Sequence, residues 1–188
     1  MTTHHSLLLR LLPMLLPAMA LFFVACSDDD DNTWESYTEW RDANNAFYEE
    51  QKFLMTPEGT NYYTTITSPS NSAAQVLIKY LTDRSKTEGN LSPLSNSTVT
   101  VKYIGRLYNG EAFDSSYNQT DSVLNFNLLS VISGWTIALQ DMRVGDSARV
   151  VIPSGQGYGA STTGSIPPYS TLVFDVKLVD IPGYEIRP

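Results

Sequence analysis

The chain has 188 residues, 42% hydrophobic and 11% aromatic, which is enough apolar surface for one globular domain with extensions and excludes disorder over most of its length. The formal net charge is −8 at pH 7 and the isoelectric point is near 4.6. Nucleic acid is therefore not an expected partner, because its phosphates would be repelled.

Residues 1–25 are predicted to be a signal peptide. Arg10 is followed by an apolar run over residues 11–25 that contains Pro13 and Pro17. This run is short for a membrane span. The two prolines and the acidic residues that follow favour a cleaved signal over a transmembrane anchor or a buried helix.

Cys26, the only cysteine, directly follows this run and the small residue Ala25. The arrangement resembles a bacterial lipoprotein cleavage site, which implies that Cys26 carries lipid and becomes the new N-terminus. Each buried acyl CH₂ contributes about 0.8 kcal/mol, so several chains hold a protein on a membrane without a spanning helix. Residues 26–33 are predicted to be the lipidated cysteine and an acidic tether.

The serine and acidic residues of this tether, Ser27 and Asp28–Asp31, resemble the surface-export signal of Bacteroidetes lipoproteins. The expected location is the bacterial outer membrane, on its periplasmic or cell-surface side.

Signal removal would also remove both histidines, His4 and His5. The mature chain would have no imidazole and no free thiol, which excludes Ser-His-Asp and Cys-His catalysis and the usual zinc sites. No metal and no cofactor are expected. The net charge would become −9, because the loss of Arg10 leaves 11 of the 12 basic residues against 20 acidic ones.

A helix is predicted over residues 34–54. Seven side chains fall near a 3.6-residue period: Trp34, Tyr37, Trp40, Asn44, Phe47, Tyr48 and Leu54. Asn32 or Thr33 is available as the N-cap, and Pro57 and Gly59 end the helix. The aromatic stripe fits an arm, a homodimer seam or packing on the chain's own domain, and the sequence leaves all three open.

An α+β domain is predicted over residues 73–182, with an antiparallel sheet wrapped around one short central helix. Residues 62–67 have strand character and residues 68–72 are predicted to be a linker, so that helix and linker together occupy residues 34–72. The domain strands are expected at residues 75–81, 99–106, 123–129, 148–152 and 171–181.

The connections of this domain have their own signals. Asn109-Gly110 predicts a hairpin and Gly145-Asp146 a turn. The central helix is predicted over residues 135–142, because Trp135, Ala138, Leu139 and Met142 share one face. Residues 183–188 form a C-terminal tail.

Several motifs follow one another in this domain: Val99–Gly105, Phe113-Asp114, Val131-Ile132-x-Gly134-Trp135, Gly157-Tyr158-Gly159, Ile166-Pro167-Pro168 and Leu172–Val176. In this order they resemble the FKBP-type peptidyl-prolyl cis-trans isomerase domain. Any single aromatic residue here is more often a core residue than a site residue. The joint occurrence of the motifs carries the resemblance. Residues 45–54, with Glu58-Gly59, resemble the segment that precedes this domain in Gram-negative secreted members.

The resemblance implies a role for each motif residue. Trp135 would be the floor beneath a proline ring, with Tyr103, Phe113, Val131 and Phe174 among the walls and Ile166 at the rim. The Ile132 backbone N–H and the Tyr158 hydroxyl would donate to substrate carbonyls, and Asp114 would orient groups near the twisting amide. Asp114, Tyr158, Ile132 and Phe174 are the predicted catalytic residues.

Three features depart from the family pattern. Leu124 takes the place of an aromatic wall, with Phe126 as the next candidate. No arginine in residues 117–122 matches the one that often accompanies the pocket aspartate, and Thr163 stands where small members have a histidine. These differences bear on substrate preference and macrolide affinity.

The implied chemistry needs neither a nucleophile nor a metal. Rotation about a peptide bond has a barrier of about 18–20 kcal/mol, and twisting removes the charge separation of the planar amide. A dry aromatic pocket would therefore disfavour the planar ground state relative to the twisted one. The sequence predicts an isomerase that acts on proline-containing polypeptides and assists the folding of envelope or surface proteins.

Two other classes stay open at this point. One is a non-catalytic module of the same fold that binds proline-containing peptides as a chaperone or adaptor. The other is a purely structural surface lipoprotein, which predicts that the polar groups of the pocket are lost.

Overall fold

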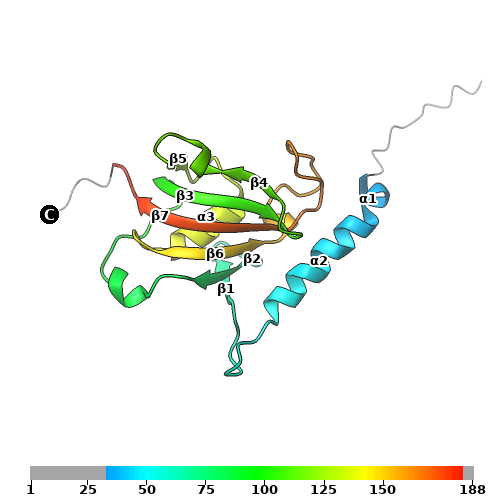
Figure 1. The fold of residues 1–188 in the computed structure, drawn as a ribbon, viewed down its shortest axis with the longest axis horizontal. Helices are drawn as coiled ribbons and strands as arrows, with labels where there is room; N and C mark the ends of the chain where they lie inside the picture. The colour runs from blue at the N-terminus through cyan, green and yellow to red at the C-terminus, as the bar shows by residue number, and fades with distance from the viewer. Residues whose placement is uncertain (1–32, 184–188) are drawn as a thin grey trace, which may run out of the picture. The chain divides into compact units, whose positions relative to one another are not determined.

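The structure is a computed structural model that describes residues 33–183 (Figure 1). Its helices are α1 (Thr33–Ser36), α2 (Thr38–Lys52) and α3 (Ser133–Asp141), with short 3₁₀ helices η1 (Arg84–Thr87), η2 (Ser116–Asn118) and η3 (Ser154–Gln156). Its strands are β1 (Thr64–Ser68), β2 (Asn71–Tyr80), β3 (Thr98–Leu107), β4 (Ala112–Ser115), β5 (Leu124–Asn127), β6 (Ser147–Ile152) and β7 (Leu172–Asp180).

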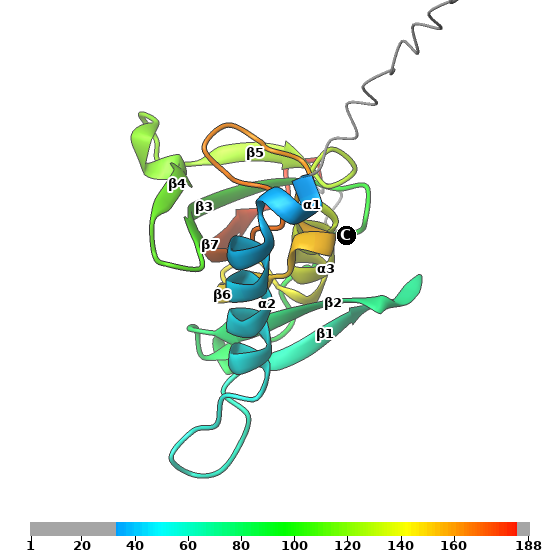
Figure 2. The same ribbon diagram turned by 90° about the vertical axis from the view of Figure 1, so that its right-hand side faces the viewer.

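The strands form one antiparallel sheet in the order β1-β2-β6-β7-β3-β4, and β5 also pairs with β3. Helix α3 lies against one face of this sheet (Figures 1 and 2). This confirms the predicted α+β class with a short central helix and an N-terminal helical extension.

The main core fills the space between α3 and the sheet. In β3, Val99, Val101 and Tyr103 are buried and alternate with partly exposed residues, as the period of two predicts. Trp135, Ala138, Leu139 and Met142 of the α3 segment are buried on the facing side. Both predicted apolar faces therefore meet in one cluster of side chains.

The sheet begins earlier than the sequence indicates. The predicted linker over residues 68–72 is a tight turn, because β1 ends at Ser68 and β2 starts at Asn71. Residues 64–67 pair with residues 75–78, so β1 and the first residues of β2 belong to the same sheet as the domain that was expected to begin at residue 73. Polar residues predict both linkers and hairpin turns, and only the pairing across the turn distinguishes them.

The predicted N-terminal helix forms as two segments, with Tyr37 preceding α2. Asn32, one of the two candidate N-caps, lies outside the described residues. The helix ends at Lys52, and Pro57 and Gly59 lie in the loop before β1.

Helix α2 packs on its own domain. Phe47 and Tyr48 pack against Leu77 and Val151, which belong to a second apolar cluster separate from the one that contains the α3 residues. The Trp40 and Phe47 rings lie 5.1 and 6.0 Å from the Tyr108 ring. Of the three alternatives that the sequence leaves open for this stripe, the described residues show packing against the same chain.

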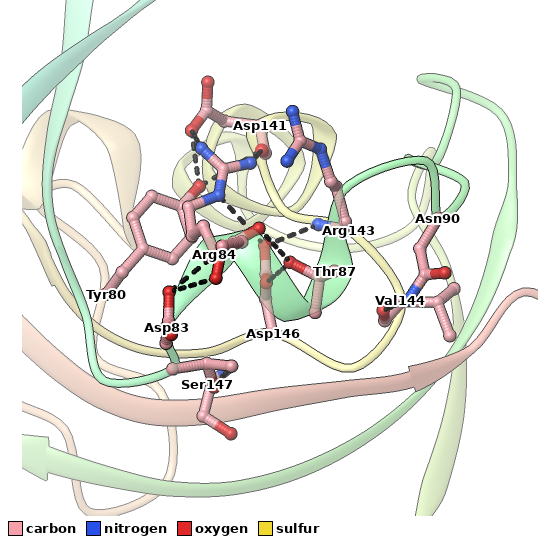
Figure 3. A network of polar contacts seen from close by, with 12 residues as sticks. Tyr80, Asp83, Arg84, Thr87, Asn90, Asp141, Arg143, Val144, Asp146 and Ser147 are labelled. Carbon is pink, nitrogen blue, oxygen red and sulfur yellow. Dashed lines mark hydrogen bonds and ion pairs between the residues drawn. The ribbon is translucent and has the colours of Figure 1, made fainter.

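A polar network joins η1 to the turn before β6 (Figure 3). The carboxylate of Asp146 is fully buried and accepts hydrogen bonds from the Thr87 hydroxyl at 2.6 Å and the Arg143 backbone N–H at 2.9 Å. Arg84 Nε lies 3.4 Å from the same carboxylate, and Arg84 Nη2 donates to the Asp141 carbonyl at 2.9 Å. A buried charge is tolerated here because it is paired and hydrogen-bonded.

Thr87→Val is expected to lower the free energy of unfolding by about 1.5–3 kcal/mol, because it removes one hydrogen bond to a buried carboxylate while it preserves side-chain shape. Urea denaturation measures this change. Thr120→Val is the matched control at an exposed loop position and should change stability by less than about 0.5 kcal/mol. Equal stability of the two variants would contradict the assigned role of the network.

Candidate active site

A cavity of about 410 Å³ opens beside the N-terminal end of α3. Its lining comes from β3, β4, β5, β7, α3 and the loops before α3 and after β6: Tyr103, Phe113, Asp114, Phe126, Ser130, Val131, Ile132, Trp135, Tyr158 and Phe174. Eight of the ten site residues predicted from sequence are in this set. The fold therefore brings together side chains that lie more than 70 positions apart in the sequence.

Trp135 forms the centre of an aromatic cluster. The rings of Tyr103, Phe174 and Phe126 lie 5.0, 5.2 and 5.3 Å from it, at interplanar angles between 79° and 88°. Phe113 meets Phe174 in the same way, at 5.6 Å and 87°. Edge-to-face pairs of this kind are favourable and fix the ring orientations.

Gly105 makes room for this cluster. It lies opposite Phe174 on β7 and Asp114 on β4. A Cβ atom at Gly105 would be 2.6 Å from the Phe113 ring and 2.8 Å from the Phe174 ring, closer than van der Waals contact allows. The sequence places Gly105 in a motif but does not indicate this packing role.

Asp114 is held on both carboxylate oxygens. The Tyr103 hydroxyl donates to Oδ2 at 2.5 Å, and the backbone N–H of Ser115 donates to Oδ1 at 2.8 Å. Burial raises the pKa of Tyr103, and the bond to Asp114 raises it further. The phenol therefore stays protonated and keeps the carboxylate in one orientation.

Two donors at the cavity remain available. Within residues 33–183, the Tyr158 hydroxyl and the Ile132 backbone N–H donate no hydrogen bond. Ile132 is the N-cap residue of α3, and a helix N-terminus favours an approaching carbonyl oxygen. Both groups can donate to a bound peptide, and the roles assigned to them stay predictions.

The predictions for Leu124 and Ile166 differ from the structure. Neither residue lines the cavity. Leu124 lies opposite Val101 and packs on the main core, while Phe126, on the same face of β5, contacts Trp135 and forms the wall. Ile166 is buried in the main core instead of standing at the rim. Ser130 also lines the cavity, and a small loop residue of this kind gives no sequence signal.

For the isomerisation that the family resemblance implies, turnover at this site is expected to stay constant from about pH 7 to pH 9.5. Burial, together with the negative charge of Asp114, raises the pKa of Tyr158 above the ordinary phenol value of about 10. The neutral phenol, which can donate, therefore persists until strongly alkaline pH. A pH profile of kcat/KM measures this, and Tyr158→Phe should lower the plateau by about tenfold through loss of one hydrogen bond. A decline between pH 7 and 8 would contradict the assignment.

Metal-binding clusters and membrane-spanning helices are absent from the described part of the chain. Residues 33–183 contain no group of three or more His, Cys, Asp and Glu side chains that could hold a metal ion. No helix in that range has the length and apolar character needed to cross a membrane. The predicted lipidation site, Cys26, lies outside the described residues.

An antiparallel sheet around one helix, with a tryptophan-floored aromatic cavity between them, defines a domain of the FKBP class. The family described as "FKBP-type peptidyl-prolyl cis-trans isomerase" matches residues 89–179. A structure of a peptidyl-prolyl cis-trans isomerase from Pseudomonas syringae is similar with a TM-score of 0.61 and 34% identity, over 77% of this chain and 95% of that one. The chain belongs to the family of FKBP-type peptidyl-prolyl cis-trans isomerases.

Curated relatives are longer than the matched region. The chain is 43% identical over 90 residues to the isomerase FkpA of Escherichia coli, covering 48% of this chain and 33% of that protein. It is 47% identical over 88 residues to a probable isomerase of Haemophilus influenzae, covering 46% and 36%. The match therefore spans about a third of the length of each of these two relatives.

Proposed function

We propose that this chain catalyses cis–trans isomerisation of peptide bonds that precede proline in polypeptides. The observation that carries the proposal is the cavity of about 410 Å³ with Trp135 at its centre, two available donors and an oriented carboxylate at its wall. The purely structural alternative predicts that these polar groups are absent, and all of them are present.

The residues act without covalent chemistry. The proline ring would pack on Trp135, and the Ile132 N–H and Tyr158 hydroxyl would hold the flanking carbonyl groups. The apolar walls keep water from the planar amide, so the less polar twisted form is favoured relative to it. A 10⁴-fold acceleration needs only about 5.4 kcal/mol of such differential stabilisation.

The test is isomerisation of a short X-Pro peptide by residues 27–188, the expected mature chain without its lipid. NMR exchange detects the reaction without a coupling protease. Exchange cross-peaks that report a rate well above the uncatalysed rate support the proposed isomerase activity. A folded sample that binds the peptide without accelerating exchange would support the non-catalytic binding module instead.

The proposal includes a site of action. A signal peptide over residues 1–25 and lipid on Cys26 would place the domain at the bacterial outer membrane, on the periplasmic or cell-surface side, where its clients would be envelope or surface proteins. The apolar run before Cys26 and the acidic tether after it support this. Labelled palmitate should be incorporated by the wild-type chain and not by Cys26→Ala.

A homodimer through residues 34–54 stays a proposal of the same kind. The face of α2 that carries Trp40, Asn44 and Phe47 is already used within the chain. Apolar surface remains at the end of the helix, where Phe53 is 69% and Met55 52% exposed. Sedimentation of residues 27–188 with and without Phe53→Ser distinguishes a dimer that uses this surface from a monomer.

A further inference from the structure

A second cavity, of about 460 Å³, lies next to the candidate active site and shares Val131 with it. It is bounded by the β1–β2 turn, the loop before β3, the segment before α3 and α3 itself. Its lining includes Ser95, Leu128, Leu129, Val131, Ser133 and Gln140.

The segment over residues 128–133 contributes to the lining of both cavities. Ser130, Val131 and Ile132 line the first cavity, while Leu128, Leu129, Val131 and Ser133 line the second. An extended chain advances about 3.3 Å per residue, so a peptide with its proline on Trp135 reaches across Val131 within a few residues.

The chemistry of the second cavity fits an uncharged stretch of polypeptide. None of its lining residues is ionisable, although the chain carries a net charge of −8. Leu129 is 73% exposed, more than any other large hydrophobic side chain among residues 35–183. A leucine held in solvent at the edge of a cavity provides apolar surface that a partner can cover.

Gln140 adds a polar contact. Its side chain is half-buried on α3, and within the described residues its amide makes no hydrogen bond. A primary amide carries both donor and acceptor groups, which is the combination that a peptide bond needs. Ser95 lines the same cavity with a hydroxyl that is likewise unpaired within the described part of the chain.

We propose that the second cavity binds the segment of the client polypeptide that adjoins the proline, with Leu129 and Val131 packing an apolar side chain and Gln140 hydrogen-bonding a peptide group. This inference rests on the proposed function and adds a specificity site to it. The second site makes the domain select prolines that have an apolar residue a few positions away in the client polypeptide.

The experiment compares three labelled peptides by fluorescence anisotropy with residues 27–188. One is a blocked Ala-Leu-Pro-Phe tetrapeptide, and the others extend it by four uncharged residues including one leucine, on the N-terminal or the C-terminal side. One of the extended peptides should bind about fivefold more tightly than the tetrapeptide, as expected for burial of part of a leucine side chain.

The variants are Leu129→Ser and Gln140→Ala, with Leu81→Ser as the matched control. Leu81 is 60% exposed and lines neither cavity. The quantity compared is the dissociation constant of the tetrapeptide divided by that of the extended peptide that binds more tightly. Leu129→Ser should bring this ratio close to one, and Gln140→Ala should reduce it. Leu81→Ser should leave the ratio as in wild type. Circular dichroism confirms that each variant is folded.

The outcomes separate the two proposals. Equal affinity of wild type for all three peptides, with NMR shifts confined to residues around Trp135, overturns the second site and leaves the isomerase intact. A ratio that survives Leu129→Ser and Gln140→Ala also overturns it. Failure to bind or isomerise any of the peptides overturns both proposals, because the second site is defined by its position beside the first.

Discussion

Phe174→Ala is expected to lower kcat/KM for an X-Pro peptide by about 100-fold. Phe174 contacts both Trp135 and Phe113, so its removal opens the cavity to water and takes away a wall against which the proline would pack. Loss of apolar contact of this size corresponds to about 2–3 kcal/mol, and each 1.36 kcal/mol is about tenfold in rate. NMR exchange on a short peptide gives the rate.

The same change also removes a buried aromatic side chain, which costs about 3–5 kcal/mol of stability. The rate must therefore be measured where circular dichroism shows the variant folded. Phe53→Ala is the control, because Phe53 is 69% exposed outside the cavity and its loss should leave the rate unchanged. Asp114→Ala gives a second test, since it removes a polar group from the wall without removing an aromatic ring.

An isomerisation rate that is unchanged in both Phe174→Ala and Asp114→Ala would show that the cavity does not catalyse the reaction. A large loss in both variants with preserved folding would place catalysis in the cavity. Loss in Phe174→Ala alone would indicate that the aromatic walls act and that the carboxylate has a different role.

The parts of the fold that repeat a simple period could be predicted from sequence. Val99, Val101 and Tyr103 alternate along β3, and the helical spacing of Trp135, Ala138 and Leu139 gives the buried face of α3. These patterns depend only on which face of an element is buried. Family motifs added most of the cavity, because each motif fixes a residue type at a fixed offset.

The remaining features depend on contacts between distant segments. Leu124 and Phe126 lie on the same face of β5, so the alternation of that strand does not indicate which one reaches Trp135. The burial of Asp146 depends on Thr87, 59 positions earlier in the chain. An acidic residue after a turn glycine looks like an exposed turn residue in the sequence, and only its tertiary partners make it a buried one.

Asn44 is the clearest example of such a residue, and its replacement should have a large effect on stability. Its side chain is fully buried in the middle of α2. Its Oδ1 accepts a hydrogen bond from the Thr171 backbone N–H at 2.7 Å, and its backbone carbonyl accepts one from the Thr171 hydroxyl at 3.1 Å. Its Nδ2 donates to the Trp40 carbonyl at 2.7 Å.

These bonds connect α2 to the loop that carries Tyr158. The Trp40 indole donates to the Ser170 hydroxyl at 3.1 Å, next to Thr171. The base of the loop is closed by a bond from the Tyr169 N–H to the Gly159 carbonyl at 2.7 Å. Tyr169 has a φ of +60°, a conformation that costs a non-glycine residue about 1–2 kcal/mol and requires support from its surroundings.

Asn44→Ala is therefore expected to lower the free energy of unfolding by about 3 kcal/mol, because it leaves the buried Thr171 N–H without an acceptor and creates a small cavity. Urea denaturation measures the change. Asn45→Ala is the matched control, because Asn45 lies next to Asn44 on the same helix but is exposed. This substitution should change the free energy of unfolding by less than about 0.5 kcal/mol.

Trp40→Phe tests whether the hydrogen bonds between α2 and the loop that carries Tyr158 also affect substrate binding at the active site. It removes the bond to Ser170 and retains a ring against Tyr108, so the protein should stay folded with about 1 kcal/mol less stability. Because the loop base would be less firmly held, hydrogen exchange at Tyr169 and Thr171 should quicken and the KM for an X-Pro peptide should rise more than kcat falls. Faster exchange with unchanged KM would limit α2 to a structural role, and unchanged exchange would show that the helix does not hold the loop at all.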